Sequence, residues 1–237
     1  MTGSGPVKGD LVKPTVSDTS HGPHEPEFDV ELYQPLFGRH DQPVALRHTE
    51  DRADLIRTKL GSGLSDQHVV DLGCNLGYIT LHLAQFARSA IGIDRDARNI
   101  RACRQIASEA GLKATFASEQ VTPGIVGKLN KMNTGPKVFL MLNIVHHLVV
   151  AESLAFAQDT IREALQDNSL LILELARREE VVPQSWGWDR LPQHELQVLP
   201  PDILDCARIR ILGWTSTHIP PYTRPMYMVQ LSAPPLD

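Results

Sequence analysis

The sequence has few cysteines, and they are not spaced for a joint role. Cys74, Cys103 and Cys206 are far apart in the 237-residue chain, and no two of them form a C-x-x-C pair. This pattern provides neither the disulfide framework of small secreted domains nor a zinc site. We therefore expect reduced thiols, a cytoplasmic location and no bound metal.

The chain also lacks an excess of basic side chains and any long apolar run. It has 23 Lys and Arg residues against 28 Asp and Glu residues, which gives a net charge of -5. No overall positive field would hold it to nucleic acid, so the composition disfavours a nucleic-acid partner, although it is compatible with a local basic patch. No apolar run is long enough to span a bilayer, and the N-terminus has no signal-peptide core, so we expect a soluble protein with no membrane partner. None of this indicates the oligomeric state.

Apolar strands alternate with amphipathic helices through the middle of the chain, and an apolar fraction of 42% supports a core. Strands are expected at 68–72, 90–93, 113–117, 138–142 and 170–175, and helices at 78–87, 97–110, 125–129 and 151–165. A preceding helix is expected between an N-cap at Thr49 and a stop at Gly61. Buried strands separated by helices predict an α/β fold with a parallel sheet covered on both faces.

The most informative stretch is 69–77, where an apolar strand runs into a turn that contains two glycines. Gly73 and Gly77 let the backbone approach a ligand closely, because glycine lacks a Cβ and tolerates positive φ. A second apolar strand ends at Asp94, about twenty residues on, where Rossmann-like folds place the carboxylate that binds ribose hydroxyls. Asp96 is available to cap the helix that follows, which leaves Asp94 for a ribose.

The turn does not favour a dinucleotide. A dinucleotide fingerprint needs G-x-G-x-x-G, so that a pyrophosphate can lie against the helix N-terminus. Here the pattern is D-x-G-x-N-x-G, and Tyr78 stands where the third glycine would be. Asn75 tolerates the left-handed region with modest strain. An NAD-linked oxidoreductase is therefore disfavoured.

The stretch from Asp71 to Gly77 resembles motif I of the class I S-adenosylmethionine-dependent methyltransferases, whose usual form is (D/E)-x-G-x-G-x-G. The departure is Asn75 in place of the middle glycine. The resemblance covers residues 66–175 and implies S-adenosyl-L-methionine as the cofactor. It also implies a doubly wound, mostly parallel seven-stranded sheet with an antiparallel C-terminal strand. The expected strands at 208–218 and 226–231 would form its closing hairpin.

The resemblance implies that the chain has one domain, which follows an N-terminal leader. Residues 1–27 are rich in Gly, Pro, Ser, Thr and His and predict a disordered leader. Residues 28–237 form a methyltransferase-like domain. Its parts are an N-terminal cap segment at 28–65, a cofactor-binding core at 66–175, and an acceptor loop with a closing β-hairpin at 176–237.

The resemblance implies a cofactor site at the carboxyl ends of the strands, where ligands of open α/β sheets bind. Asp94 would accept both ribose hydroxyls, and Glu119 would accept the adenine amino group unless it is a solvated loop acid. The basic residues upstream of the core are Arg39, His40, Arg47 and Arg52, and one of these arginines would clamp the methionine carboxylate unless it is a surface residue. The cofactor-binding residues expected are Asp71, Gly73, Cys74, Asn75, Gly77, Asp94, Arg95, Glu119, Asn143 and Arg47.

His146 lies just beyond the fourth expected strand, in a stretch, 142–148, that resembles the motif IV region of many class I methyltransferases. Neutral imidazole titrates near working pH, so His146 is the candidate catalytic base for a hydroxyl acceptor. A structural role is the alternative for His146, and it is favoured for His147. Aromatic and basic residues of the last third either line an acceptor pocket or anchor their loop; they are Trp186, Trp188, Tyr222, Arg224 and Tyr227. Arg224 is the candidate for binding an anionic acceptor.

We therefore predict a methyltransferase that acts on a small-molecule or glycan acceptor at oxygen. The turn and the residues after it are also similar to enzymes that methylate terminal phosphates on RNA or polysaccharide. In that case His146 and the arginines would bind the acceptor instead of removing a proton, and the acidic net charge makes RNA the weaker choice. A third hypothesis is a non-catalytic, methyltransferase-like partner subunit, which Asn75 would favour.

Overall fold

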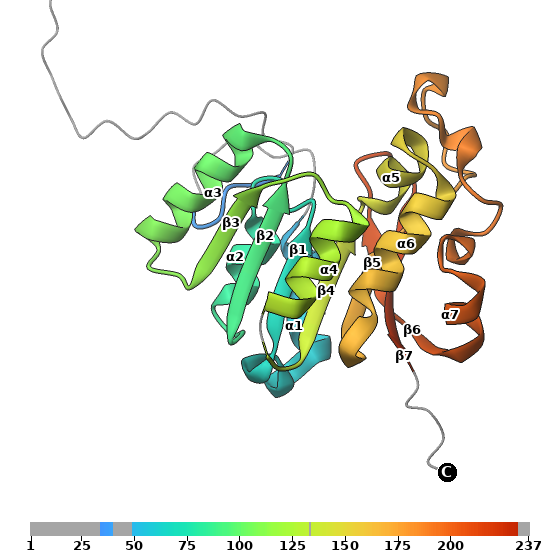
Figure 1. Cartoon of the computed structure of the whole chain (residues 1–237). Helices are drawn as coiled ribbons and strands as arrows, with labels where there is room; N and C mark the ends of the chain where they lie inside the picture. Colours follow the sequence, from blue (N-terminus) through green and yellow to red (C-terminus); the bar gives the residue numbers. More distant parts are fainter. Residues whose placement is uncertain (1–33, 40–48, 133, 232–237) are drawn as a thin grey trace, which may run out of the picture.

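The computed structural model describes residues 34–39, 49–132 and 134–231, and its centre is a seven-stranded sheet (Figure 1). The strand order is β3-β2-β1-β4-β5-β7-β6. The strands are β1 (His68–Leu72), β2 (Ser89–Asp94), β3 (Ala114–Ser118), β4 (Lys137–Leu142), β5 (Leu170–Glu174), β6 (Ala207–Ser216) and β7 (Thr223–Leu231). β7 pairs antiparallel with both β5 and β6, and the other pairs are parallel. The predicted fold class is confirmed.

Helices cover both faces of the sheet (Figure 1). One face carries α1 (Glu50–Leu60), α2 (Tyr78–Ala84) and α3 (Ala97–Glu109), and the other carries α4 (Pro123–Met132), α5 (Val145–Ala151), α6 (Leu154–Ala164) and α7 (Pro201–Cys206). The alternation of side chains along a strand divides the core between these layers. In β4, Val138 and Leu140 pack with the α1 and α2 side, whereas Phe139 and Met141 pack with the α4 and α6 side. An apolar strand is needed because both of its faces are buried.

Local signals place the starts of α1, α2 and α3 correctly. The side chain of Asp96 caps α3 by accepting a hydrogen bond from the backbone N–H of Arg98 at 2.8 Å, as predicted. Thr49 is the N-cap residue of α1, as predicted, and Gly61 ends that helix with a φ of 59°. None of the helices in the described part of the chain is long and apolar enough to cross a membrane.

One predicted helix is wrong in its extent. The sequence pattern predicts a helix at 151–165, but α6 starts only at Leu154, and α5, which the pattern did not predict, precedes it with a break at Glu152 and Ser153. Ser153 causes the restart, because its hydroxyl accepts the backbone N–H of Phe156 at 3.1 Å and caps α6. The two adjacent histidines therefore lie inside α5. The predicted leader, residues 1–27, lies outside the described residues, as do residues 28–33 and 40–48 of the predicted cap segment.

Candidate active site

The turn between β1 and α2 places three residues in the left-handed region. The φ angles are 77° at Gly73, 51° at Asn75 and 69° at Gly77, and Gly and Asn are the residues that adopt them at least cost. A Cβ on Gly73 would lie 2.7 Å from Cδ1 of Ile144, and one on Gly77 would lie 2.8 Å from Sγ of Cys103. Both glycines are therefore required by packing as well as by backbone conformation.

Asp94 at the end of β2 holds this turn and retains capacity for a ligand. Its Oδ2 accepts the backbone N–H of Asn75 at 2.9 Å, and its Oδ1 accepts the backbone N–H of Asp96 at 2.8 Å. A carboxylate has about four acceptor positions, so each oxygen keeps one for a further donor. A pair of neighbouring hydroxyls, as in a ribose, matches this capacity.

Asn75 contributes a second acceptor at the same edge of the sheet. Its Oδ1 is buried and accepts no hydrogen bond from any residue in the described part of the chain. A buried amide oxygen without a donor costs free energy unless a ligand supplies one. The ammonium of a methionine moiety is such a donor, so the residues present fit an adenosyl cofactor that carries an amino group.

Asp71 and Cys74 lie in the turn, but their side chains face the protein. The Asp71 carboxylate is buried and accepts the hydroxyl of Thr80 at 2.6 Å. Burial, with a smaller contribution from nearby Asp94, raises the pKa of Asp71 from 3.8 to about 6. The Cys74 thiol packs in the core beside Cys103, and burial raises its pKa. Any contact of Asp71 or Cys74 with a cofactor therefore comes from backbone atoms.

Two further predicted residues lie beside Asp94. Glu119 is exposed, and its backbone N–H donates to the carbonyl of Asp94 at 3.0 Å. Arg95 is exposed, and its carbonyl accepts the hydroxyl of Ser118 at 3.3 Å. Both residues are thus at the edge where β2 and β3 end, and their predicted roles in cofactor binding stay predictions.

Asn143 follows β4 with a φ of 61° and is joined to a buried ion pair. Its Oδ1 accepts a hydrogen bond from Nη1 of Arg224 in β7. Arg224 also pairs with both carboxylate oxygens of Glu180, at 2.8 Å from Nε and 2.6 Å from Nη2. Arg224 and Glu180 are only 1% and 3% exposed. The prediction that Arg224 binds an anionic acceptor is wrong, because Glu180 already neutralises its charge inside the protein.

An aromatic contact joins this ion pair to His146. The Trp188 ring lies 5.3 Å from Cζ of Arg224, and the His146 ring meets it edge-on at 5.3 Å between centroids. His146 is 6% exposed, whereas the neighbouring His147 is exposed. Trp188 is therefore a packing residue of the α5 side, and His146 is the buried member of the histidine pair.

Arg52 is not available as a clamp for a carboxylate. It is 1% exposed, and its Nε pairs with Oε2 of Glu174 at 2.6 Å. Its guanidinium also donates to the carbonyl of Ser216, which ties α1 to β5 and β6. The prediction that an arginine upstream of the core binds the methionine carboxylate is therefore wrong for Arg52. Arg39 pairs with Glu109 at the surface, at 2.8 Å, and His40 and Arg47 lie outside the described residues.

The remaining aromatic candidates anchor their segments or are surface residues. The Tyr227 hydroxyl donates to Glu195 at 2.9 Å, which ties β7 to the polar segment at 177–200. Trp186 is 40% exposed and packs against Trp188, with centroids 5.8 Å apart. Tyr222 lies in the turn before β7, where its backbone N–H donates to Ile219. None of these contacts by itself identifies an acceptor pocket.

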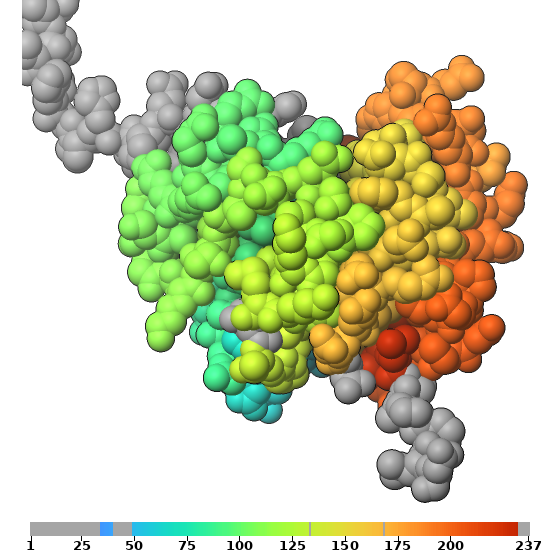
Figure 2. All heavy atoms as spheres, in the orientation of Figure 1, coloured from blue at the N-terminus to red at the C-terminus, as the bar shows by residue number. Residues whose placement is uncertain are grey.

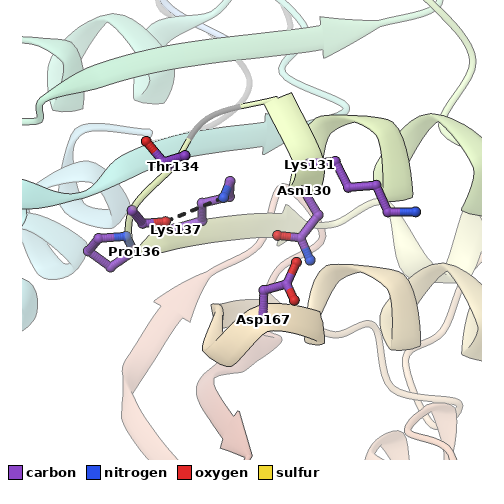
Figure 3. A pocket seen from close by; sticks show the side chains of 7 residues that line it. Asn130, Lys131, Thr134, Pro136, Lys137 and Asp167 are labelled. Atoms are coloured by element: carbon purple, nitrogen blue, oxygen red, sulfur yellow. Dashed lines mark hydrogen bonds between the residues drawn. The ribbon is translucent and has the colours of Figure 1, made fainter.

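The surface is notched at the end of the molecule to which the parallel strands point in Figure 1. In the space-filling view, this notch separates the α3 side from the segment at 177–200 (Figure 2). A separate cavity of about 660 Å³ lies at the other end of β4 (Figure 3). Asn130 and Asp167 face one another across it, and Lys137 starts β4 there, about 20 Å of strand away from Asn143. This cavity is therefore not part of the candidate site.

The residues missed by sequence reasoning are mainly partners across long sequence separations. Glu174 and Glu180 are buried acids whose partners, Arg52 and Arg224, are 122 and 44 residues away. The one available signal was Glu174, an acid at the end of the otherwise apolar strand Leu170–Glu174. An acid in such a place needs a buried partner.

The chain has relatives of known function, although no protein-family model matches it. It is 31% identical over 208 residues to the O-antigen chain terminator bifunctional methyltransferase/kinase WbdD of Escherichia coli. The match covers 84% of this chain and 28% of the relative, so the chain spans less than a third of the curated relatives it matches. A solved structure of WbdD matches with 30% identity and a TM-score of 0.72 over 84% of this chain and 43% of that one.

More distant structures share the fold alone. Magnesium protoporphyrin IX methyltransferase (ChlM) from Synechocystis PCC 6803, with bound SAM, is 21% identical and gives a TM-score of 0.53. The match covers 77% of this chain and 79% of the ChlM chain. The N-methyltransferase NodS from Bradyrhizobium japonicum WM9, in complex with S-adenosyl-L-homocysteine, is 14% identical over 78% of this chain and 87% of its own, with a TM-score of 0.54.

Proposed function

Because the chain belongs to the class I S-adenosylmethionine-dependent methyltransferases, we propose that it methylates an oxygen at the end of a glycan chain. S-adenosylmethionine is the cofactor of this family. The bound cofactor supplies a methyl group already activated on a sulfonium, so the protein has mainly to align the acceptor and exclude water.

The observation that carries the proposal is the arrangement around Asp94. Its carboxylate lies beside the glycine turn, accepts one backbone N–H on each oxygen, and keeps one acceptor position on each. Asn75 adds a buried oxygen that has no donor in the described part of the chain. We assign Asp94 to the ribose hydroxyls, Asn75 to the methionine ammonium, and the backbone at Gly73 and Gly77 to the close approach of the cofactor.

The glycan acceptor rests on the relatives. WbdD is named as an O-antigen chain terminator, and its 31% identity extends over 84% of this chain. The notch above the ends of β2 and β4 opens to the surface, as a site for the end of a long chain requires (Figure 2). A small-molecule acceptor would be expected in a more enclosed site.

We assign His146 as the base if the acceptor is a hydroxyl. The ring lies at the start of α5, just beyond the end of β4, and would take the proton that the hydroxyl loses as the new O–C bond forms. A phosphate oxygen needs no base, and the kinase in the relative's name makes a phosphorylated glycan end the second candidate. The two differ in pH dependence, because a histidine base gives a rate that falls as pH decreases through its titration.

Labelled S-adenosylmethionine tests the proposal directly. The full chain should transfer the labelled methyl group to polysaccharide from a bacterial surface extract and leave S-adenosylhomocysteine as the second product. Phosphatase treatment of the polysaccharide distinguishes the candidates, since it abolishes transfer only to a phosphate. A chain that binds the cofactor but labels no glycan with or without phosphatase treatment would contradict the glycan assignment.

A further inference from the structure

The side-chain amide of Asn143 is held in one orientation. Its Oδ1 accepts from Nη1 of Arg224, and a guanidinium has only N–H donors to offer. The Nδ2 group cannot take the place of Oδ1, because two donors would then face each other. Asn143 therefore always turns its oxygen toward Arg224 and its NH₂ group away.

Arg224 cannot move to release the amide. The guanidinium edge formed by Nε and Nη2 binds both carboxylate oxygens of Glu180, and Glu180 also accepts the backbone N–H of Arg177 at 2.9 Å. The ion pair is almost fully buried, with Trp188 against the guanidinium at 5.3 Å. A bidentate pair in such surroundings is among the most rigid side-chain contacts in proteins. The pair is thus a fixed support for Asn143.

The Nδ2 group of Asn143 is left as a donor at the candidate site. Nothing in the described part of the chain accepts a hydrogen bond from it, and it is not one of the buried atoms without a partner, so solvent reaches it. Its residue follows β4 directly, and the next residue, Ile144, contacts the motif I turn at Gly73. The free donor therefore lies next to the turn that we assign to the cofactor.

We propose that Asn143 donates this hydrogen bond to the acceptor oxygen and that Arg224 and Glu180 are positioning residues which make the site selective for oxygen over nitrogen. The proposal rests on the proposed function. An acceptor oxygen has two or three lone pairs, so one can bind Nδ2 while another attacks the methyl carbon. A neutral amine has a single lone pair, which the attack requires, and its N–H groups would face the NH₂ group of Asn143.

The test replaces the donor without removing its support. In Asn143→Asp, the carboxylate still pairs with Arg224 and Asp tolerates the left-handed backbone, but Nδ2 becomes an acceptor. The matched control is Gln230→Glu, which makes the same amide-to-carboxylate change on an exposed residue at the opposite end of β7. We expect Asn143→Asp to lower kcat/KM for glycan methylation at least 100-fold and to leave the Kd for S-adenosylhomocysteine within threefold of wild type. Gln230→Glu should change neither.

A second readout does not depend on turnover. In the wild-type protein loaded with S-adenosylhomocysteine, the side-chain NH₂ signal of Asn143 in a ¹⁵N-correlated NMR spectrum should shift when inorganic phosphate is added and stay in place when methylammonium is added. Glu180→Gln should broaden or split this signal and lower kcat/KM about tenfold without changing the Kd for S-adenosylhomocysteine.

Three results would overturn the inference. They are an unshifted Asn143 signal with phosphate, an unchanged kcat/KM in Asn143→Asp, or a loss of S-adenosylhomocysteine affinity in that variant, which would place the amide on the cofactor. Failure of the proposed function looks different, because the wild-type chain would then label no glycan.

Discussion

The buried carboxyl group of Asp71 makes stability depend on pH in a way that one substitution removes. The Asp71 carboxylate lies in the core beneath the motif I turn, where it accepts the hydroxyl of Thr80 at 2.6 Å. In Asp71→Asn, the amide oxygen can still accept this hydroxyl, and the shape of the side chain is kept. The substitution therefore removes the ionisation and little else.

The size of this pH-dependent change in stability follows from the pKa of Asp71. Burial raises the pKa of Asp71 from 3.8 to about 6, so the folded protein binds this proton more tightly than the unfolded chain does. The stabilisation from the protonated form is complete below about pH 4, is lost as pH rises toward 6, and is absent above that. A shift of about two pKa units corresponds to about 3 kcal/mol in the free energy of unfolding.

Urea unfolding at a series of pH values from 4 to 8 measures this effect. The stability of Asp71→Asn relative to wild type should rise by about 3 kcal/mol between pH 4 and pH 7, since only the wild type loses a proton from the core. Asp205→Asn, which removes an exposed carboxylate from α7, is the control, and its free energy of unfolding should change with pH in parallel with that of the wild type. Parallel curves for Asp71→Asn and wild type would refute the reasoning.

Three further predictions concern the turn, the α1 anchor and the candidate base. Gly73→Val should abolish S-adenosylhomocysteine binding in calorimetry, because the left-handed backbone and the contact with Ile144 exclude a branched side chain; normal binding would place the cofactor elsewhere. Arg52→Leu should lower the free energy of unfolding by about 3 to 5 kcal/mol, because it leaves Glu174 buried without this partner; a loss below about 1 kcal/mol in urea unfolding would contradict the buried pair. With a hydroxyl acceptor, His146→Ala should lower the methylation rate about 100-fold at unchanged cofactor affinity, and an unchanged rate would leave His146 a structural role.

The sequence predicts those parts of the fold that depend on local pattern. The apolar run at 68–72 and the assignment of Asp96 as the cap of α3 hold in the structure, because strand burial and capping depend on neighbouring residues. The geometry of the motif I turn was also predictable, since Gly and Asn are the residues that adopt positive φ.

Pairings between distant residues were not predictable in the same way. Arg224 and Arg52 read as possible ligand-binding cations, and nothing near them in the sequence shows that Glu180 and Glu174 neutralise them. Such pairs form only when the sheet brings β7 and α1 beside segments that are 44 and 122 residues away. The start of α6 is an intermediate case, because Ser153 is a residue type that caps helices, yet the sequence pattern predicts a start at 151 and does not predict α5.

The central claim is that Asp94 binds the ribose of S-adenosylmethionine at the carboxyl ends of β1 and β2. Isothermal titration of S-adenosylhomocysteine into the wild type, Asp94→Ala and Asp96→Ala tests it most directly. We predict one binding site in the wild type. Asp94→Ala should lose about 2 kcal/mol of binding free energy, because the substitution removes a charged acceptor of two hydroxyls. Asp96→Ala should bind with wild-type affinity, because it loses only the cap of α3. Equal affinities in the wild type and Asp94→Ala, or no binding by the wild type, would contradict it.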